Sequence, residues 1–222
     1  MFDQLKIGSK SSYDDFEASV ATRKLNKPKK KSIKETVPFS NVAYDFSAIN
    51  GEVYWEEREL EYVFEITGDT PAELETKRAA FVSWVMNVQN EEIHDPFIPN
   101  YHFIGTFKDI NEDDDESIEK TTVTVTFAAY PYMIANEAKQ YSVGAVANAE
   151  STIAVVNESS HRITPTFNSD VAFTVTIGNA SYGVSAGETT DDACKLPVGT
   201  NVLKLKASEV GTVNISFYEE VF

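Results

Sequence analysis

Strict alternation of apolar and polar residues is the feature that most constrains how this chain can fold. In residues 59–67, ELEYVFEIT, the even-numbered positions are apolar and the odd-numbered ones are mostly glutamates. In residues 121–127, TTVTVTF, two valines and Phe127 alternate with threonines. A period of two is typical of a β-strand with one buried and one solvated face. The sequence therefore predicts a sheet that packs against a core on one side and meets water on the other.

Two further signals bound this sheet. Residues 101–107, YHFIGTF, read as a third strand, in which Gly105 marks a β-bulge or a point of close packing. Proline has no backbone N–H to donate to a neighbouring strand. Pro131 therefore predicts that the strand that begins at residue 121 ends near Tyr130.

One α-helix is predicted over residues 71–88. Thr70 is a favoured N-cap residue, Pro71 occupies the first helical position, and Glu73 follows the cap by three residues. The apolar residues of one helix face follow: Leu74, Phe81, Val85 and Val88. Arg78 lies beside this face, and Trp84 lies away from its centre. We expect this face to pack against the sheet.

The last third of the chain has a purely β rhythm. Residues 135–150 are small and weakly patterned, which indicates a domain junction that carries one short strand. Five apolar segments follow, separated by turn-like stretches such as GNASYG, SAGET and PVGTN: Ile153–Val156, Ile163–Phe167, Val171–Ile177, Val202–Leu205 and Val213–Phe217. Short strands at this spacing favour a small β-sandwich. We expect a mainly β fold with one helix, divided into domains 1–136 and 137–222.

Charge is abundant and unevenly distributed. The chain carries 35 acidic and 19 basic residues, for a net charge of −16, so it is poorly suited to bind nucleic acid phosphates. Residues 23–34 hold seven bases and no acid, whereas residues 109–119 hold seven acids and no base. The two blocks are either solvated loops or complementary surfaces of a subunit contact. In the second case the candidate interface residues are Lys29, Lys30, Lys31, Asp113, Asp114 and Asp115.

Signs of catalysis, metal binding or cofactor binding are weak. A glycosidase requires two carboxyl groups that converge across a cleft. The sequence gives no sign of such convergence for its five clustered glutamates, Glu56, Glu57, Glu59, Glu61 and Glu65. The three histidines, His94, His102 and His161, lack the spacing of a zinc motif. Cys194 sits beside acids that raise a thiol pKa. We therefore predict no enzyme, no metal and no cofactor.

Cellular context is suggested by what the sequence lacks. No apolar run approaches the roughly 18 residues that would span a bilayer, and the start of the chain does not read as a signal peptide. The single cysteine excludes an internal disulfide and fits assembly in a reducing cytoplasm. We expect no membrane insertion.

Several segments, taken in order, resemble a known family. In residues 1–134 they are IGSKSSYDDF, a basic hairpin-like stretch, YDFSAINGEVYWEERELEYVFEI, DPFIPNYHFIGTF, the acidic segment and TTVTVTFAAYPYM. Together they resemble the N-terminal domain of distal tail (Dit-like) proteins from siphophages, the long, non-contractile-tailed phages, and prophages of Gram-positive bacteria. In residues 150–222, VVNESSHRITPTF and LPVGTNVLKLKASEVGTVNISFYE resemble the galectin-like second domain of many such proteins.

The resemblance implies a structural role at the tail tip of a virion. Distal tail proteins form a hexameric ring, assembled in the host cytoplasm, that joins the tail tube to a baseplate or tail-associated fibre protein. The N-terminal β-sandwich or α+β domain forms the ring, and the galectin-like domain projects outward and can hold receptor-binding proteins. Since such a ring passes DNA without binding it stably, we expect a lumen lined with acidic or neutral polar groups.

Two other functions remain open on the sequence. A carbohydrate-binding adhesion module would use an exposed aromatic ring beside polar groups, for which Tyr182 and His161 are the candidates. Aromatic residues on the predicted strands, such as Trp55 and Tyr101, could also line a sugar platform, although they fit a core or a subunit interface better. A tail-associated glycosidase or peptidase is the third possibility.

Overall fold

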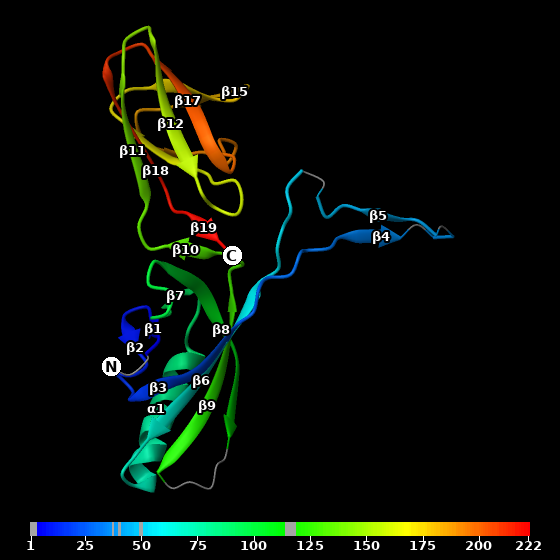
Figure 1. The fold of residues 1–222 in the computed structure, drawn as a ribbon, viewed down its shortest axis with the longest axis vertical. Coiled ribbons are helices and arrows are strands. Elements are labelled where there is room, and N and C mark those ends of the chain that lie inside the picture. The colour runs from blue at the N-terminus through cyan, green and yellow to red at the C-terminus, as the bar shows by residue number, and fades with distance from the viewer. Residues whose placement is uncertain (1–3, 37, 40, 49–50, 114–118) are drawn as a thin grey trace. The chain divides into compact units, whose positions relative to one another are not determined.

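The structure, a computed structural model, describes residues 4–36, 38–39, 41–48, 51–113 and 119–222. The chain divides into two compact units, here called unit 1 (Met1–Met133 with Phe222) and unit 2 (Ile134–Val221). Figure 1 shows that strands dominate both units, and α1 (Pro71–Met86) is the one α-helix among the described residues. The predicted fold class, mainly β with one helix, is confirmed. No helix within the described ranges is long and apolar enough to cross a membrane.

Unit 1 is built on one antiparallel sheet with the strand order β2-β1-β7-β8-β9-β6-β3. Its strands are β1 (Lys6–Ile7), β2 (Lys10–Ser11), β3 (Ala18–Leu25), β6 (Arg58–Thr67), β7 (Glu91–His94), β8 (Tyr101–Asp113) and β9 (Lys120–Ala129). Because α1 packs on one face of this sheet, unit 1 has the α+β form of the predicted architecture.

The helix begins where its cap predicts. The Glu73 amide donates to Thr70 Oγ1 over 3.3 Å, and the Glu73 carboxylate accepts from the Asp69 amide over 3.2 Å. These two bonds satisfy donors at the helix start that would otherwise lack partners. The helix ends at Met86, two residues earlier than predicted, although Val88 still packs in the core.

Alternation along β6 and β9 places one face of the sheet in the core. The side chains on this face have no exposed surface: Leu60, Tyr62, Phe64, Ile66, Val123, Val125 and Phe127. Phe81 of α1 packs against Phe64 with ring centroids 4.8 Å apart. Gly105 proves to be a close-packing point, since a Cβ there would lie 2.6 Å from Ile93 Cδ1. The β-bulge of β8 instead lies between Phe107 and Asp109.

The interpretation of residues 109–119 as a solvated loop is wrong for residues 109–113. β8 continues to Asp113, and residues 109–113 pair with β9 in a regular register that ends at Asp113 opposite Thr122. The backbone of residues 109–113 finds its hydrogen-bond partners on the threonine-rich β9. The acidic composition of these residues does not predict this pairing. The rest of the block up to residue 118 lies outside the described residues.

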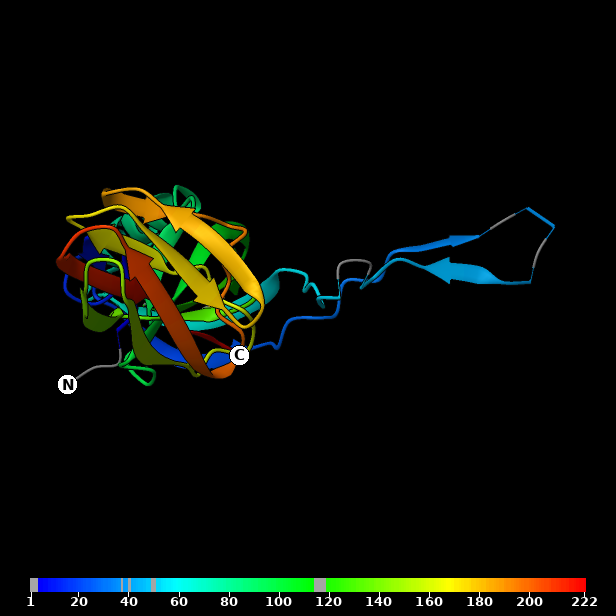
Figure 2. The same ribbon diagram turned by 90° about the horizontal axis from the view of Figure 1, so that it is seen from above.

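A long arm, residues 26–57, separates β3 from β6 in the sequence. It carries the hairpin formed by β4 (Lys34–Thr36) and β5 (Ala43–Asp45), which pair only with each other. Figure 2 shows this hairpin at the end of an extended two-stranded stem. None of the apolar side chains that the structure describes in the arm belongs to the buried core of unit 1.

Unit 2 contains two four-stranded sheets, with orders β11-β18-β13-β16 and β12-β17-β14-β15. The strands are β11 (Lys139–Ala145), β12 (Glu150–Asn157), β13 (Thr166–Ser169), β14 (Phe173–Ile177), β15 (Ala180–Val184), β16 (Gly187–Thr190), β17 (Gly199–Ala207) and β18 (Gly211–Phe217). Short strands β10 (Met133–Ala135) and β19 (Glu220–Val221) complete the fold. Residues of both sheets form one buried cluster that includes Val155, Phe167, Leu203 and Ile215, as in a β-sandwich.

Three expectations for unit 2 need correction. The strand predicted over Ile163–Phe167 begins only at Thr166, because Ile163 instead forms an isolated bridge with Leu196. The strand predicted from Val171 begins at Phe173, since Ser169 Oγ bonds the Val171 backbone and folds a local turn there. The stretches GNASYG and SAGET contain parts of β15 and β16 rather than only turns.

Candidate assembly interface

The stem of the arm continues the pairing of β3 with β6 beyond the sheet. The Asn26 amide donates to the Glu59 carbonyl over 3.0 Å, and the Glu56 amide donates to the Lys29 carbonyl over 2.8 Å. One step farther out, the Lys31 amide donates to the Tyr54 carbonyl over 2.8 Å. The arm is therefore anchored to unit 1 by regular antiparallel hydrogen bonds.

Local polar contacts shape the arm where the stem meets its hairpin. Ser47 is buried, accepts from the Ile33 amide over 2.9 Å and donates its own amide to Asp45 Oδ1 over 2.9 Å. Hydrogen bonds from Ser47, together with the charges of Lys34 and Lys30, hold the pKa of Asp45 below its usual value. These polar contacts shape the base of the hairpin, and no apolar side chain described in the arm is buried in a core cluster.

The arm exposes many apolar side chains. Among the described residues, seven exposed large apolar side chains lie in the arm: Ile33, Phe39, Val42, Tyr44, Phe46, Val53 and Tyr54. A two-stranded hairpin alone is marginally stable in water, and clustered exposed apolar groups mark interaction surfaces. The arm therefore has the character of a segment that another surface covers.

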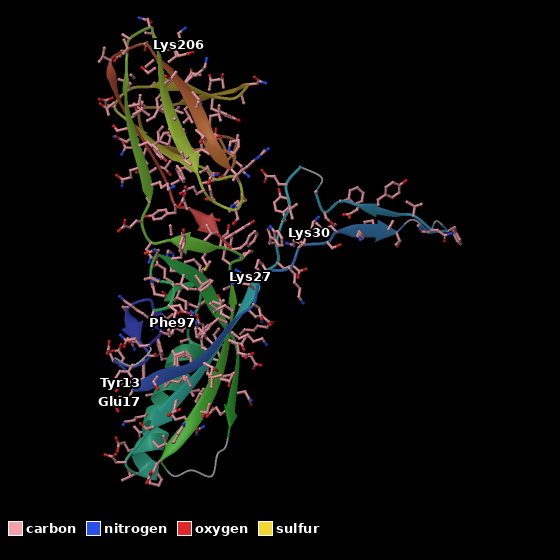
Figure 3. All side chains as sticks on the ribbon, in the orientation of Figure 1. Tyr13, Glu17, Lys27, Lys30, Phe97 and Lys206 are labelled. Atoms are coloured by element: carbon pink, nitrogen blue, oxygen red, sulfur yellow. The ribbon has the colours of Figure 1, made fainter. Side chains whose placement is uncertain are left out.

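The basic residues of segment 23–34 have different places in the structure: Arg23 forms an ion pair in unit 1, and others lie on the arm. Arg23 on β3 is engaged, since its Nη1 lies 2.5 Å from the buried carboxylate of Asp95, which also accepts from the Tyr62 hydroxyl over 3.1 Å. Burial, with the nearby Asp95 charge, raises the pKa of Tyr62. The candidates Lys29, Lys30 and Lys31 are exposed along the stem, and Figure 3 shows Lys30 farther out on the arm than Lys27.

The described residues of the two charge blocks lie at opposite ends of the sheet of unit 1. The β6–β9 register pairs Arg58 with Ala129 at the end where the arm leaves, and Thr67 with Lys120 at the other end. Asp113 ends β8 at that second end, roughly 30 Å away along a ten-residue strand. Asp114 and Asp115 lie outside the described residues. Contact between the blocks within one subunit would therefore require spanning the sheet.

The face of the sheet opposite α1 is polar. We call it the polar sheet face; by strand parity its polar residues include Thr22, Lys24, Glu59, Glu61, Glu65, Asp109, Asn111, Thr122, Thr124 and Thr126, and Val63 and Ala128 lie among them. Its bases are paired in part, since Lys120 Nζ lies 2.5 Å from Glu65 and Lys108 binds Glu59. Lys108 also lowers the pKa of Glu59. Acids and threonines thus dominate an extended surface with few free cations.

The candidate catalytic groups do not form a catalytic arrangement. Glu59, Glu61 and Glu65 point the same way along one strand, and Glu56 and Glu57 are exposed at the arm stem. Cys194 is buried, and this burial, with the charge of Asp191, raises the pKa of its thiol to about 11.

We predict that Cys194 is nearly inert toward thiol reagents in the folded protein. With a pKa of about 11, only about one thiol in a thousand is ionised at pH 8. Alkylation at pH 8 should therefore be roughly 100-fold slower than in urea-unfolded chain, and should accelerate as the pH rises toward the thiol pKa. Mass spectrometry of timed iodoacetamide reactions measures this ratio, and equal rates in both states would contradict it.

The two candidate sugar-contacting residues lie apart. Tyr182 is half-buried on β15, and its neighbour Val175 pairs with Leu205 of β17. His161 follows β12, whose last residue Asn157 pairs with Gly199, and its Nε2 lies 3.2 Å from Glu220. Leu205 and Gly199 are roughly 20 Å apart along β17, so the two residues do not form one platform.

A cluster that the sequence did not predict lies on β7 and β8. Ligand atoms of Glu92, His94 and His102 all fall within 4.8 Å of one another. Sequence motifs for metal sites mostly record ligands on a helix or in Cys-x-x-Cys pairs. Here two neighbouring strands contribute, and the usable signal was the alternation Glu92-x-His94 followed by a second histidine on the next predicted strand.

Comparisons with known proteins give matches among solved structures. No protein-family model matches this chain, and no curated protein does. The crystal structure of the SPP1 Dit (gp 19.1) protein, described as a paradigm of the hub adsorption apparatus in phages that infect Gram-positive bacteria, matches with a TM-score of 0.70. The match is 15% identical in sequence and covers 98% of this chain and 99% of that one.

Two structures of the phage p2 baseplate in its activated conformation, with Sr and with Ca, also match, each at 9% identity. Their TM-scores of 0.41 and 0.38 are too low to establish a common fold, although coverage is 98% and 97% of this chain and 98% of each p2 chain. The chain therefore has the fold of the SPP1 Dit protein over nearly its whole length, and the predicted resemblance to distal tail proteins is confirmed at the level of the fold.

Proposed function

We propose that this protein is a non-enzymatic distal tail protein, which forms a hexameric ring at the tail tip of a virion. In this role it connects the tail tube to a baseplate or tail fibre protein. The fold shared with SPP1 Dit supports the choice of family. The observation that carries the assembly role is the arm, an anchored hairpin whose described residues include seven exposed apolar side chains and no member of the buried core.

Ring geometry explains why the arm and its acceptor lie on different parts of the subunit. In a closed ring every copy offers one surface to the neighbour on one side and a different surface to the other. The arm supplies the first surface, with Lys29, Lys30 and Lys31 at its stem. We assign the second to the acidic end of β8 and the residues after it, Asp113, Asp114 and Asp115. The separation of Asp113 from the arm stem along the sheet favours contact between subunits over contact within one.

The polar sheet face fits the lumen of such a ring. DNA phosphates are held by unpaired lysine and arginine side chains, and this face offers mostly glutamates, threonines and paired lysines. A lumen of this kind lets DNA pass without stable binding. The net charge of −16 also repels DNA phosphates.

The proposed division into two domains agrees with this role. Residues 1–136 form the ring domain, and residues 137–222 form a galectin-like domain that holds receptor-binding proteins or other adhesion components. The ring assembles in the host cytoplasm before it joins the tail. The separation of Tyr182 from His161 gives no support to a sugar-binding role for the second domain.

The test is assembly of the purified full chain, measured by native mass spectrometry and negative-stain microscopy over a range of protein concentrations. Six-fold rings support the proposal, and a monomer at every concentration contradicts autonomous ring formation. Rings of another symmetry would contradict the hexamer alone.

Reversing the charges at Lys29, Lys30 and Lys31 to glutamate should weaken the ring at low salt. We expect the concentration for half-maximal assembly to rise about tenfold, equivalent to roughly 1.4 kcal/mol. At 1 M salt, where the Debye length is about 3 Å, the difference from the unmodified chain should largely disappear.

The matched control reverses three lysines of unit 2, Lys195, Lys204 and Lys206, which leaves the net charge change identical. Combining the arm reversals with lysines at Asp113, Asp114 and Asp115 should restore assembly, because the complementary signs are then exchanged. An unchanged assembly curve for the arm variant, or equal loss in the control, would refute the pairing of the two blocks.

A further inference from the structure

We propose that Glu92, His94 and His102 form a binding site for a divalent transition-metal ion, with Zn²⁺ as the best-fitting occupant. The inference concerns unit 1 by itself and does not depend on ring formation. Its ligand atoms lie within 4.8 Å of one another and come from two paired strands.

Sheet register brings the ligands together. β7 and β8 pair Glu92 with Ile104 and Ile93 with Phe103, and the next step of the same register sets His94 opposite His102. The two imidazole centroids are 5.1 Å apart. Ile93 and Phe103 point into the core, so the three ligands share the opposite face, where Glu92 and His94 follow each other at a spacing of two.

The donor set selects the class of metal. Two imidazole nitrogens and one carboxylate oxygen suit Zn²⁺ and its transition-metal neighbours, whereas Ca²⁺ and Mg²⁺ prefer sites made of oxygen alone. Zinc–ligand bonds are about 2.0–2.2 Å, so tetrahedral ligand atoms stand about 3.5 Å apart. His94 Nε2 and Glu92 Oε2 are already 3.0 Å apart, and all three ligand atoms lie within 4.8 Å of one another.

Exposure and charge permit entry of the ion. His102 is buried, while the side chains of His94 and Glu92 keep 32% and 56% of their surface exposed. A fourth, solvent position is therefore accessible, as in sites with three protein ligands. The carboxylate of Glu92 supplies a negative charge that attracts the cation. Lys6, which lies opposite His94 on the neighbouring strand β1, is positively charged and acts against this attraction.

A bound ion would join β7 to β8 beside their connection, residues 95–100. This connection carries Asp95, which binds Arg23 and Tyr62. The expected consequence is a metal-dependent rise in the thermal stability of unit 1, since an ion that binds only the folded state stabilises it.

The decisive experiment titrates ZnCl₂ into the untagged full chain by isothermal calorimetry, with MgCl₂ and CaCl₂ as parallel probes. We expect one zinc per chain and no comparable binding of Mg²⁺ or Ca²⁺. Co²⁺ should give the visible absorption typical of a four-coordinate site with nitrogen ligands.

Variants locate the site. Glu92→Gln and His94→Gln should each weaken zinc binding at least tenfold and remove the zinc-dependent shift in melting temperature. The matched control, His161→Gln, changes the histidine of unit 2 and should bind zinc as the parent does. Because His102 is buried, only the two more accessible ligands are substituted, and circular dichroism checks that both variants fold. Absence of one-site zinc binding, or equal affinity in both ligand variants and the control, would overturn the proposal.

Discussion

A chain in which Asn-Gly replaces residues 32–53 is expected to remain folded and to form no rings. Lys31 and Tyr54 are hydrogen-bonded partners, so a two-residue turn can close the stem between them. The variant loses the hairpin with most of the exposed apolar side chains but keeps the basic stem. It also keeps Trp55, whose ring packs 4.8 Å from that of Phe222.

The free energy of unfolding of the shortened chain distinguishes loss of assembly from loss of folding. Because no described residue of the arm belongs to the apolar core, the free energy of unfolding should change by less than about 1 kcal/mol. Assembly is measured by native mass spectrometry beside the parent chain. A second variant keeps the arm length but carries Phe39→Ser, Val42→Thr and Tyr44→Ser, and it should lose most assembly as well. Rings of normal stability in the shortened chain would show that the arm is not the assembly element.

Phe81→Ala should destabilise unit 1 by about 4 kcal/mol, the range expected when a fully buried phenylalanine is truncated. Phe81 is fully buried, and its ring contacts Phe64 at 4.8 Å, Trp84 at 5.8 Å and Phe16 at 6.3 Å. Both tryptophans, Trp55 and Trp84, belong to unit 1, so tryptophan fluorescence during urea unfolding reports this unit selectively.

Met86→Ala on the same helix is the control, because Met86 is 53% exposed and its truncation should cost less than about 1 kcal/mol. Equal, small effects of both substitutions would mean that the helix does not pack on the sheet as described. A loss at Phe81 that appears only in probes of unit 2 would contradict the assignment of the core.

The sequence predicted the elements whose local signals agree with their packing. The alternation in residues 59–67 predicted β6 correctly because each even-numbered side chain is also a core residue. The helix at Thr70 followed from a capping pattern that depends only on neighbours in the chain. In such places local and tertiary preferences coincide.

Elements that depend on a partner strand were harder to predict. The acidic end of β8 forms a strand because β9 lies beside it, and its own composition disfavours that conformation. β15 and β16 contain glycine-rich stretches that look like turns until their partners β14 and β13 are known. The hairpin-like character of the arm came from the family resemblance, and its exposed apolar surface needed the structure.

The candidate sites divide in the same way. Lys29, Lys30 and Lys31 could be singled out because charge blocks are visible in sequence, but their position at the opposite end of the sheet from Asp113 required the register. The cluster of Glu92, His94 and His102 was missed because cross-strand neighbours have no fixed sequence spacing. The same register separated Tyr182 from His161.

The distance between the arm stem and the far end of β8 has a consequence for how copies would accumulate. In the proposed ring, every incomplete arc of subunits would leave one unoccupied arm and one unoccupied acceptor, however many copies it contained. Only the last addition satisfies both at once, so arcs of intermediate size should be scarce. Single subunits and finished circles should then coexist, with little between them.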